Sequence, residues 1–385
     1  MLELLFLLLP IAAAYGWFMG RNSVRNEQRR EQEQFSQKYV TGINLLLSDQ
    51  SDKAVDLFVD ILDVDSETLD THWALGKLFR RRGEVERAIR IHQNLISRPS
   101  LSEHDRHQAL FELGEDYLSA GLYDRAEKMF TDLQYQPKFR VQSLYNLISI
   151  YEATHEWHKA IKVGLKISRS DKSVEPMIAQ FYCELADVQD NAETSLKFYS
   201  KALKHDRNCV RASLSLGRWW LGQGRYKKGL AFLTQILYQD PQFISEALPL
   251  IKDAYEALDD TSGLVGYLHE CLQTAPSAEV VVSLAELIRQ QNTNEEAEQF
   301  LFQALAQSPT TKGFHKLIEL HIQSAETGKA KDSLIMIRNM VAERLKRAHT
   351  YACRQCGFAG QTLYWHCPSC KSWSSMKPVK GLDGE

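Results

Sequence analysis

Residues 75–99 read LGKLFRRRGEVERAIRIHQNLISRP, and two later stretches share their spacing: LGEDYLSAGLYDRAEKMFTDLQYQP at 113–137 and LGRWWLGQGRYKKGLAFLTQILYQDP at 216–241. In each stretch a Leu-Gly pair is followed by an aromatic residue three positions after the glycine and by a second glycine seven positions after it. A small residue comes next, Ala88, Ala126 or Gly229. Because such small residues let two helices approach closely, the pattern predicts a helix, a tight turn and a second antiparallel helix in each stretch.

Weaker copies of this spacing occur elsewhere in the chain. They are marked by Gly42, Ala54 and Phe58, by Leu147, Tyr151, Trp157 and Ala160, by Leu185, Ala186, Tyr199 and Ala202, by Tyr255, Cys271 and Pro276, and by Leu284, Ala285, Ala297, Ala304 and Pro309. A last, degenerate unit near Phe314 and Leu317 is expected to cap the stack. The period of about 34 residues is typical of tetratricopeptide repeats, of which about nine fit between residues 36 and 347. We therefore expect an all-α superhelix whose concave face binds peptides or partner proteins.

Composition and missing motifs narrow the class of protein. The 385 residues include 46 basic and 49 acidic side chains, a net charge of −3, so no overall field attracts the chain to nucleic acid. Only 20 glycines and 10 prolines are present, which disfavours collagen and turn-rich β folds. The sequence contains no GxxxxGK[ST], HExxH, GxSxG or strand-linked GxGxxG motif. We expect no enzymatic activity.

The N-terminus predicts a transmembrane anchor over residues 1–20. Leu4 to Gly20 is an uncharged and mostly apolar run of seventeen residues, at the short end of the length that spans a bilayer. Glu3 precedes it and Arg21, Arg25, Arg29 and Arg30 follow, which is the reverse of a secretory signal and keeps the bulk of the chain in the cytoplasm. Residues 21–35 would form a basic linker. A cleaved signal peptide and a buried core helix are the alternatives.

The C-terminal tail, residues 348–385, contains the sharpest chemical signal. Cys353 and Cys356 form one CxxC pair, and Cys367 and Cys370 form a second. Four thiolates at this spacing are typical of a closed structural zinc site or a rubredoxin-type iron site, and we predict that they bind one metal ion, Fe or Zn. A thiol redox pair is the alternative reading. The tail is too short to fold without such an ion.

Other side chains of the tail have two readings. The aromatic residues are expected to wrap the metal site as a small core or to dock on the last helix, residues 333–347, and a partner-facing patch is the alternative; they are Tyr351, Phe358, Tyr364, Trp365 and Trp373. The basic residues would offset the charge of the thiolates, and nucleic-acid binding is the rival interpretation; they are Arg354, Lys371, Lys377 and Lys380. Cys183, Cys209 and Cys271 are predicted to be small buried residues of the repeats.

Together these features closely resemble the lipopolysaccharide assembly protein B family of Gram-negative bacteria. The resemblance rests on the anchor MLELLFLLLPIAAAYGWFMGR, on the repeat segments DKAVDLF, GEVERAIRIHQ and AGLYDRAE, and on TLYWHCPSC in the tail. It implies a rubredoxin-like domain on the four tail cysteines, with Lys371 departing from the glycine that a typical rubredoxin has there. That departure counts against electron transfer.

The resemblance also implies a function and partners. The implied function is that of a non-enzymatic adaptor of the inner membrane, which presents the lipid A deacetylase to the membrane-anchored ATP-dependent protease FtsH. A further implied partner is an inner-membrane protein that senses lipopolysaccharide. Three rivals remain: a scaffold that gathers synthetic enzymes near the exporter, an iron redox enzyme, and a nucleic-acid-binding ribbon. A homodimer stays open.

Overall fold

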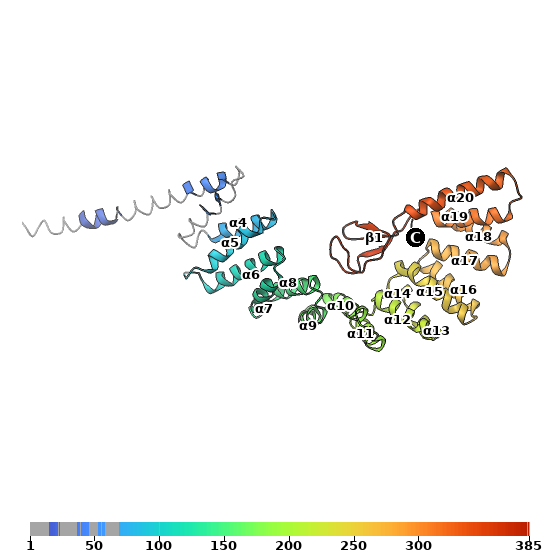
Figure 1. Cartoon of the computed structure of the whole chain (residues 1–385), viewed down its shortest axis with the longest axis horizontal. Helices are drawn as coiled ribbons and strands as arrows, with labels where there is room; N and C mark the ends of the chain where they lie inside the picture. Colours follow the sequence, from blue (N-terminus) through green and yellow to red (C-terminus); the bar gives the residue numbers. More distant parts are fainter. Residues whose placement is uncertain are drawn as a thin grey trace, which may run out of the picture. The chain divides into compact units, whose positions relative to one another are not determined.

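A computed structural model describes residues 15–21, 23, 37–38, 40–45, 53–54, 56–57, 69–99, 101–382 and 384 (Figure 1). The chain divides into two compact units, Met1–Thr154 and His155–Glu385. Within the described residues, no helix has both the length and the apolar character needed to cross a bilayer. Most of the predicted anchor and of the basic linker lies outside the described residues, so both stay predictions.

Unit 1 is built from consecutive helices that pack on one another. They are α4 (Leu69–Arg81), α5 (Val85–Ile96), α6 (Glu103–Ser119), α7 (Tyr123–Leu133) and α8 (Arg140–Ala153). The helices α4 and α5 coincide with the first quoted stretch, and α6 and α7 coincide with the second. The predicted repeat around Gly42 and Ala54 lies mostly outside the described residues, so the count of nine stays a prediction.

Unit 2 continues the helical pattern and ends in a small sheet (Figure 1). Its helices are α9 (Trp157–Ile167), η2 (Lys172–Val174), α10 (Glu175–Asp187), α11 (Ala192–His205), α12 (Val210–Gly222), α13 (Tyr226–Leu233), α14 (Ile236–Gln239), η3 (Pro241–Phe243), α15 (Ile244–Ala257), α16 (Thr261–Thr274), α17 (Ala278–Gln291), α18 (Asn294–Gln307), α19 (Thr311–Ser324) and α20 (Lys329–Arg347). The pairs α10–α11, α12–α13, α15–α16, α17–α18 and α19–α20 are packed together, as the repeat pattern predicts.

The glycines of the pattern have the two roles that the sequence suggested. At Gly114 an added Cβ would lie 2.8 Å from Cζ of Phe130, so only glycine lets α6 and α7 come this close. The later glycine of the pattern turns the chain between the helices, with φ of 80° at Gly83, 72° at Gly121 and 68° at Gly224.

A buried polar network links the helix pair α4–α5 of unit 1 to the pair α6–α7. The Arg80 guanidinium donates to Asp116 Oδ1 at 2.6 Å and to Glu112 Oε2 at 2.9 Å, while His92 Nδ1 lies 2.5 Å from Asp116 Oδ2. Burial by itself raises the pKa of Glu112, but hydrogen bonds from Lys77 and Arg80 outweigh it and hold that pKa below its usual range. These groups fix the register of neighbouring helices.

Candidate metal centre and its docking on the repeats

Residues 351–378, called the ribbon from here on, form a three-stranded antiparallel sheet. Its strands are β1 (Tyr351–Cys353), β2 (Ala359–Gly360) and β3 (Met376–Pro378), in the order β2-β1-β3. Tyr351 lies opposite both Gly360 and Pro378. The sheet places Cys353 at the end of the central strand, where the first CxxC pair begins.

The two CxxC pairs have matching backbone turns. The N–H of Gly357 donates to the carbonyl of Cys353 at 3.0 Å, and the N–H of Lys371 donates to the carbonyl of Cys367 at the same distance. Gly357 has φ of 78° and Lys371 has φ of 58°, so both are left-handed. Lys371 thus takes the backbone conformation that glycine has in the first turn, although its Cβ makes that conformation unfavourable.

The turns bring all four predicted cysteines together. Their sulfur atoms lie within 4.8 Å of one another, with 3.7 Å between Cys353 and Cys370 and 3.8 Å between Cys356 and Cys367. Metal–sulfur bonds of about 2.3 Å in a tetrahedron separate the sulfurs by about 3.8 Å. The spacing therefore fits a single tetrahedral ion, and it is much longer than the ~2.05 Å of a disulfide.

Neighbouring hydroxyl groups favour the thiolate form at two of the four cysteines. A hydrogen bond with Ser375 lowers the pKa of the Cys353 thiol to about 6, and one with Ser372 lowers the pKa of Cys370. Burial raises the pKa of Cys367 to about 11, although backbone N–H groups of its turn point at its sulfur. A bound cation would supply the remaining stabilisation of that thiolate.

The ribbon is docked on the repeats of unit 2 through Lys377 and Trp365. Lys377 Nζ lies 2.5 Å from Asp240 Oδ2 and 4.5 Å from the centre of the Phe243 ring. On the same phenylalanine, the Trp365 ring stacks with a centroid distance of 5.3 Å. The short helix η3 and the residue before it therefore hold the ribbon by charge, by a cation–π contact and by stacking.

A second group of contacts surrounds Trp373. Its ring meets Trp157 edge-on at 6.2 Å and Phe181 at 5.8 Å. Beside it, Gln180 Nε2 donates to Ser374 Oγ at 3.0 Å. Figure 1 shows the ribbon beyond the C-terminal end of α20, on the side of unit 2 where these helices lie.

Three polar contacts extend the docked surface. The Tyr351 hydroxyl donates to Glu246 on α15, and an Arg354 guanidinium nitrogen donates to Gln242 Oε1 at 3.2 Å. After the ribbon, the carbonyl of Leu382 accepts from the N–H of Thr311 at 2.6 Å. The tail thus contacts unit 2 from α9 to α19.

Comparisons with known proteins agree with this architecture. A family model described as a rubredoxin metal binding domain matches residues 351–378, and a tetratricopeptide repeat model matches residues 72–103. Lipopolysaccharide assembly protein B of Escherichia coli strain K12 is 44% identical over 390 residues, which covers 100% of both chains. The chain belongs to the lipopolysaccharide assembly protein B family. The protein of that name from Haemophilus influenzae is 39% identical over 396 residues, again with 100% of both chains covered.

Solved structures show more distant similarity to this family member. A crystal structure of MamA protein is 17% identical with a TM-score of 0.34, covering 47% of this chain and 96% of that one. A tetratricopeptide repeat protein from Parabacteroides merdae is 16% identical with a TM-score of 0.33, covering 66% of this chain and 99% of that one.

In this member of the lipopolysaccharide assembly protein B family, the tail aromatics divide between two roles. Tyr351 packs in the ribbon's own core, and Phe358 is packed against it. Trp365 and Trp373 instead contact η3, α9 and α10, so the idea that they dock on the last helix, residues 333–347, is wrong. The reason is that α20 runs back along the stack, and the ribbon that follows it reaches earlier repeats (Figure 1). Tyr364 is 44% exposed and takes part in neither group.

The basic residues of the tail are also partly committed to the docked surface. Lys377 forms an ion pair with Asp240, and Arg354, although exposed, donates to Gln242. Lys371 and Lys380 are exposed. Two of the four predicted cations therefore face the protein's own repeats, which disfavours the nucleic-acid reading.

Sequence reasoning missed the residues that receive the ribbon. Gln180, Asp240 and Glu246 resemble ordinary polar positions of helical repeats, and no local pattern distinguishes them. Cys183, Cys209 and Cys271 are buried, as expected. The sequence did not indicate that Cys183 and Cys209 lie together, with sulfur atoms 3.8 Å apart.

Unit 1 has a second candidate site, an open hollow of about 430 Å³. Side chains of α4, α6 and α8 line it: Lys77, Arg80, Arg81, Phe111, Glu112, Glu115, Gln142, Tyr145 and Asn146. Each of these helices is the first of its predicted repeat, and stacks of such repeats bind partners on an extended concave surface. The mixture of amide, guanidinium and carboxylate groups suits the backbone and charged side chains of a peptide.

Proposed function

We propose that this protein is a membrane-anchored, non-enzymatic adaptor that restrains lipopolysaccharide synthesis by presenting the lipid A deacetylase to the protease FtsH. The observation that carries the proposal is the match at 44% identity, over the whole of both chains, to a protein named for lipopolysaccharide assembly. A link to an inner-membrane protein that senses lipopolysaccharide belongs to the same proposal.

Inner-membrane anchoring is supported by the apolar run from Leu4 to Gly20. The described part of that run is helical. Its aromatic side chains are largely exposed, Tyr15 at 65%, Trp17 at 65% and Phe18 at 62%, and they form a surface suited to lipid. The Arg21 guanidinium lies 5.1 Å from the centre of the Trp17 ring, at the end where the cytoplasm is expected to begin. An anchor would confine the repeats to the same surface as a membrane protease and raise the local concentration of a bound client.

A structural role for the metal centre is supported by its closed donor set. Four thiolates complete the tetrahedral coordination of one metal ion and leave no coordination position for substrate or water. Two tryptophans next to these cysteines are used to hold the ribbon on the repeats. The metal would therefore stabilise a binding scaffold, whether the ion is iron or zinc.

The hollow of unit 1 supports an adaptor, because it offers polar groups on an open face. Arg81 and Gln142 are exposed there. Beside them, Asn146 Nδ2 donates to a carboxylate oxygen of Glu115. We assign client binding to this hollow.

The test is the lifetime of the lipid A deacetylase after translation is blocked, in cells that carry the full chain, no chain, or the chain without residues 1–20. We expect the half-life to lengthen severalfold in the second and third cases. A double substitution Gln142→Ala and Asn146→Ala should lengthen it too, while the control Lys197→Ala, in an exposed ion pair with Glu193, should not. An unchanged half-life without the protein would reject the proteolytic role and favour a scaffold for the synthetic enzymes.

A further inference from the structure

The last helix of the repeats, α20, has an apolar side that nothing in the described chain covers. It is 19 residues long, and none of its residues is buried. It packs on α19, yet Met336 is 61% exposed, Ile337 43% and Met340 66%. A helix that ends a repeat stack normally turns a polar face to water, so these three side chains require an explanation.

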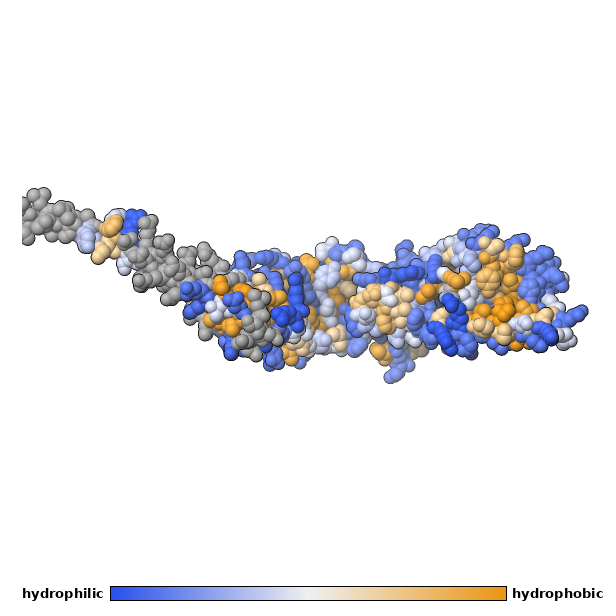
Figure 2. All heavy atoms as spheres, turned by 90° about the horizontal axis from the view of Figure 1, so that it is seen from above, coloured by the Kyte–Doolittle hydropathy of each residue, from blue (hydrophilic) through white to orange (hydrophobic). Residues whose placement is uncertain are grey.

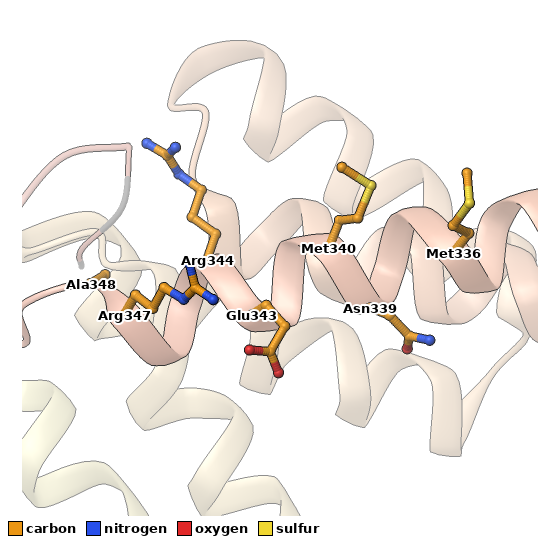
Figure 3. Close-up of a pocket in the computed structure, with 7 residues that line it drawn as sticks. All are labelled: Met336, Asn339, Met340, Glu343, Arg344, Arg347 and Ala348. Carbon is orange, nitrogen blue, oxygen red and sulfur yellow. The ribbon is translucent and has the colours of Figure 1, made fainter.

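The exposed methionines border an open hollow of about 730 Å³ (Figure 3). Its lining consists of Met336, Asn339, Met340, Glu343, Arg344, Arg347 and Ala348. Figure 3 shows Met336 and Met340 pointing to the same side of the helix, one turn apart. Methionine side chains adapt their shape to an inserted group, so this spacing suits the apolar side chains of a second helix.

The same helix is strongly basic in a chain whose net charge is −3. It has six Lys or Arg residues and two carboxylates, Asp332 and Glu343, a net charge of +4. Glu343 is paired with Lys346 at 2.9 Å. Arg347 has no hydrogen bond or ion pair with another described residue, so its charge is available to an incoming carboxylate.

These charges decide between the occupants that an apolar helix face can have. A second copy of α20 would bring +4 against +4, which opposes pairing of the two faces. An anionic membrane would match the arginines, but the face is a recess with Glu343 in its lining, and only three large apolar side chains are available to insert. An acidic amphipathic helix fits this face best. It offers both apolar side chains to fill the recess and carboxylates to meet the arginines.

We propose that the hollow along α20 is a docking site for an acidic amphipathic helix of a partner protein. Apolar side chains of that helix, spaced three or four residues apart, occupy the recess between Met336 and Met340. Its carboxylates face Arg344 and Arg347 at the C-terminal end of α20. The site is distinct from the docked ribbon and from the hollow of unit 1, and the inference does not rest on the proposed function.

Fluorescence anisotropy with the purified full chain tests this inference. The probe is a labelled synthetic helix with leucines at positions i, i+4 and i+7 and glutamates on their flanks, and the comparison peptide has lysine in place of every glutamate. We expect saturable binding of the acidic peptide only, weakened at least tenfold by Met340→Lys and by Arg347→Glu. The control Val188→Lys changes a side chain that is 64% exposed and lies outside α20, and it should leave binding unchanged.

Four results would overturn the inference. They are no binding of the acidic peptide, equal binding of both peptides, binding that Met340→Lys leaves intact in a protein with native circular dichroism, and displacement of the peptide by phosphatidylglycerol vesicles. Sedimentation adds the test for a second copy: a dimer that Met340→Lys converts to monomer would assign the face to self-association instead.

Discussion

The ammonium of Lys377 lies 2.5 Å from the carboxylate of Asp240, across 137 residues of sequence. Their side chains are 16% and 20% exposed, so water screens this pair only partly. Asp240 also follows the last residue of α14, and its side chain accepts a hydrogen bond from the backbone N–H of Gln242. This hydrogen bond holds the Asp240 side chain at the start of η3. One carboxylate therefore both shapes a turn of the repeats and receives the ribbon.

Replacing Asp240 by Asn should loosen the ribbon. The amide keeps a hydrogen-bond acceptor for the turn but leaves Lys377 with an uncompensated charge, and we expect a loss of about 1–3 kcal/mol. Hydrogen exchange of the amides of residues 351–378 measures the effect. Lys197→Ala, which breaks an exposed pair, is the control and should leave ribbon protection unchanged. Equal protection in Asp240→Asn and the native protein would show that the aromatic contacts alone hold the ribbon.

Substituting Cys356 by Ser should release the metal. Three thiolates no longer close a tetrahedral site, and the ribbon has too little apolar surface to stay folded without the ion. Metal content by mass spectrometry should fall from about one ion per chain toward zero, with Trp365 and Trp373 becoming accessible to acrylamide quenching. Cys370→Ser should behave in the same way, whereas Cys271→Ser, at a buried cysteine far from both CxxC pairs in sequence, should retain the metal. Full occupancy in Cys356→Ser would contradict four-thiolate ligation.

Replacing Lys371 by Gly should stabilise the ribbon. At φ of 58° a side chain with a Cβ is unfavourable, and its removal is expected to gain about 0.5–1 kcal/mol after the greater backbone freedom of glycine is counted. The rate of metal transfer to a chelator should decrease. The reciprocal variant, Gly357→Ala, should increase that rate, and two variants that act in the same direction would argue against the backbone explanation.

Acid should weaken unit 1 through His72. Burial lowers the pKa of this imidazole from about 6.5 to about 4, with smaller contributions from Arg98 and His92. The unfolded chain therefore takes up the proton first, and stability falls as the pH decreases from about 6.5 to about 4.

The measurement is hydrogen exchange in α4 and α5, corrected for the intrinsic rates. Between pH 7 and pH 5 the native protein should lose about 1–2 kcal/mol more than His72→Leu. His269→Leu, at an exposed histidine, should keep the native pH dependence. An identical pH dependence in His72→Leu would assign the acid sensitivity to other groups.

The local parts of this structure could be read from the sequence, and the long-range ones could not. Gly83, Gly121 and Ala88 each form a turn or a contact inside a single helix pair, where the spacing along the chain determines which atoms meet. The four cysteines are predictable for the same reason, because two residues separate the ligands of each pair.

Docking of the ribbon depends on another kind of information. Trp373 and Phe181 are far apart in sequence, and their meeting depends on the accumulated geometry of every repeat between them. No spacing rule covers that distance. From the sequence, nucleic-acid binding was a possible role for the basic residues of the tail. In the fold, Lys377 forms an ion pair with Asp240 instead.

The contacts that the tail makes with unit 2, from α9 to α19, affect how the protein unfolds. In an open stack each repeat touches only its neighbours, so internal segments can melt independently. Here the tail connects distant repeats, and opening any one of them strains the others. Unit 2 should therefore unfold as one cooperative block, more slowly than a stack of its size, and a chain cut before Cys370 would revert to piecewise melting.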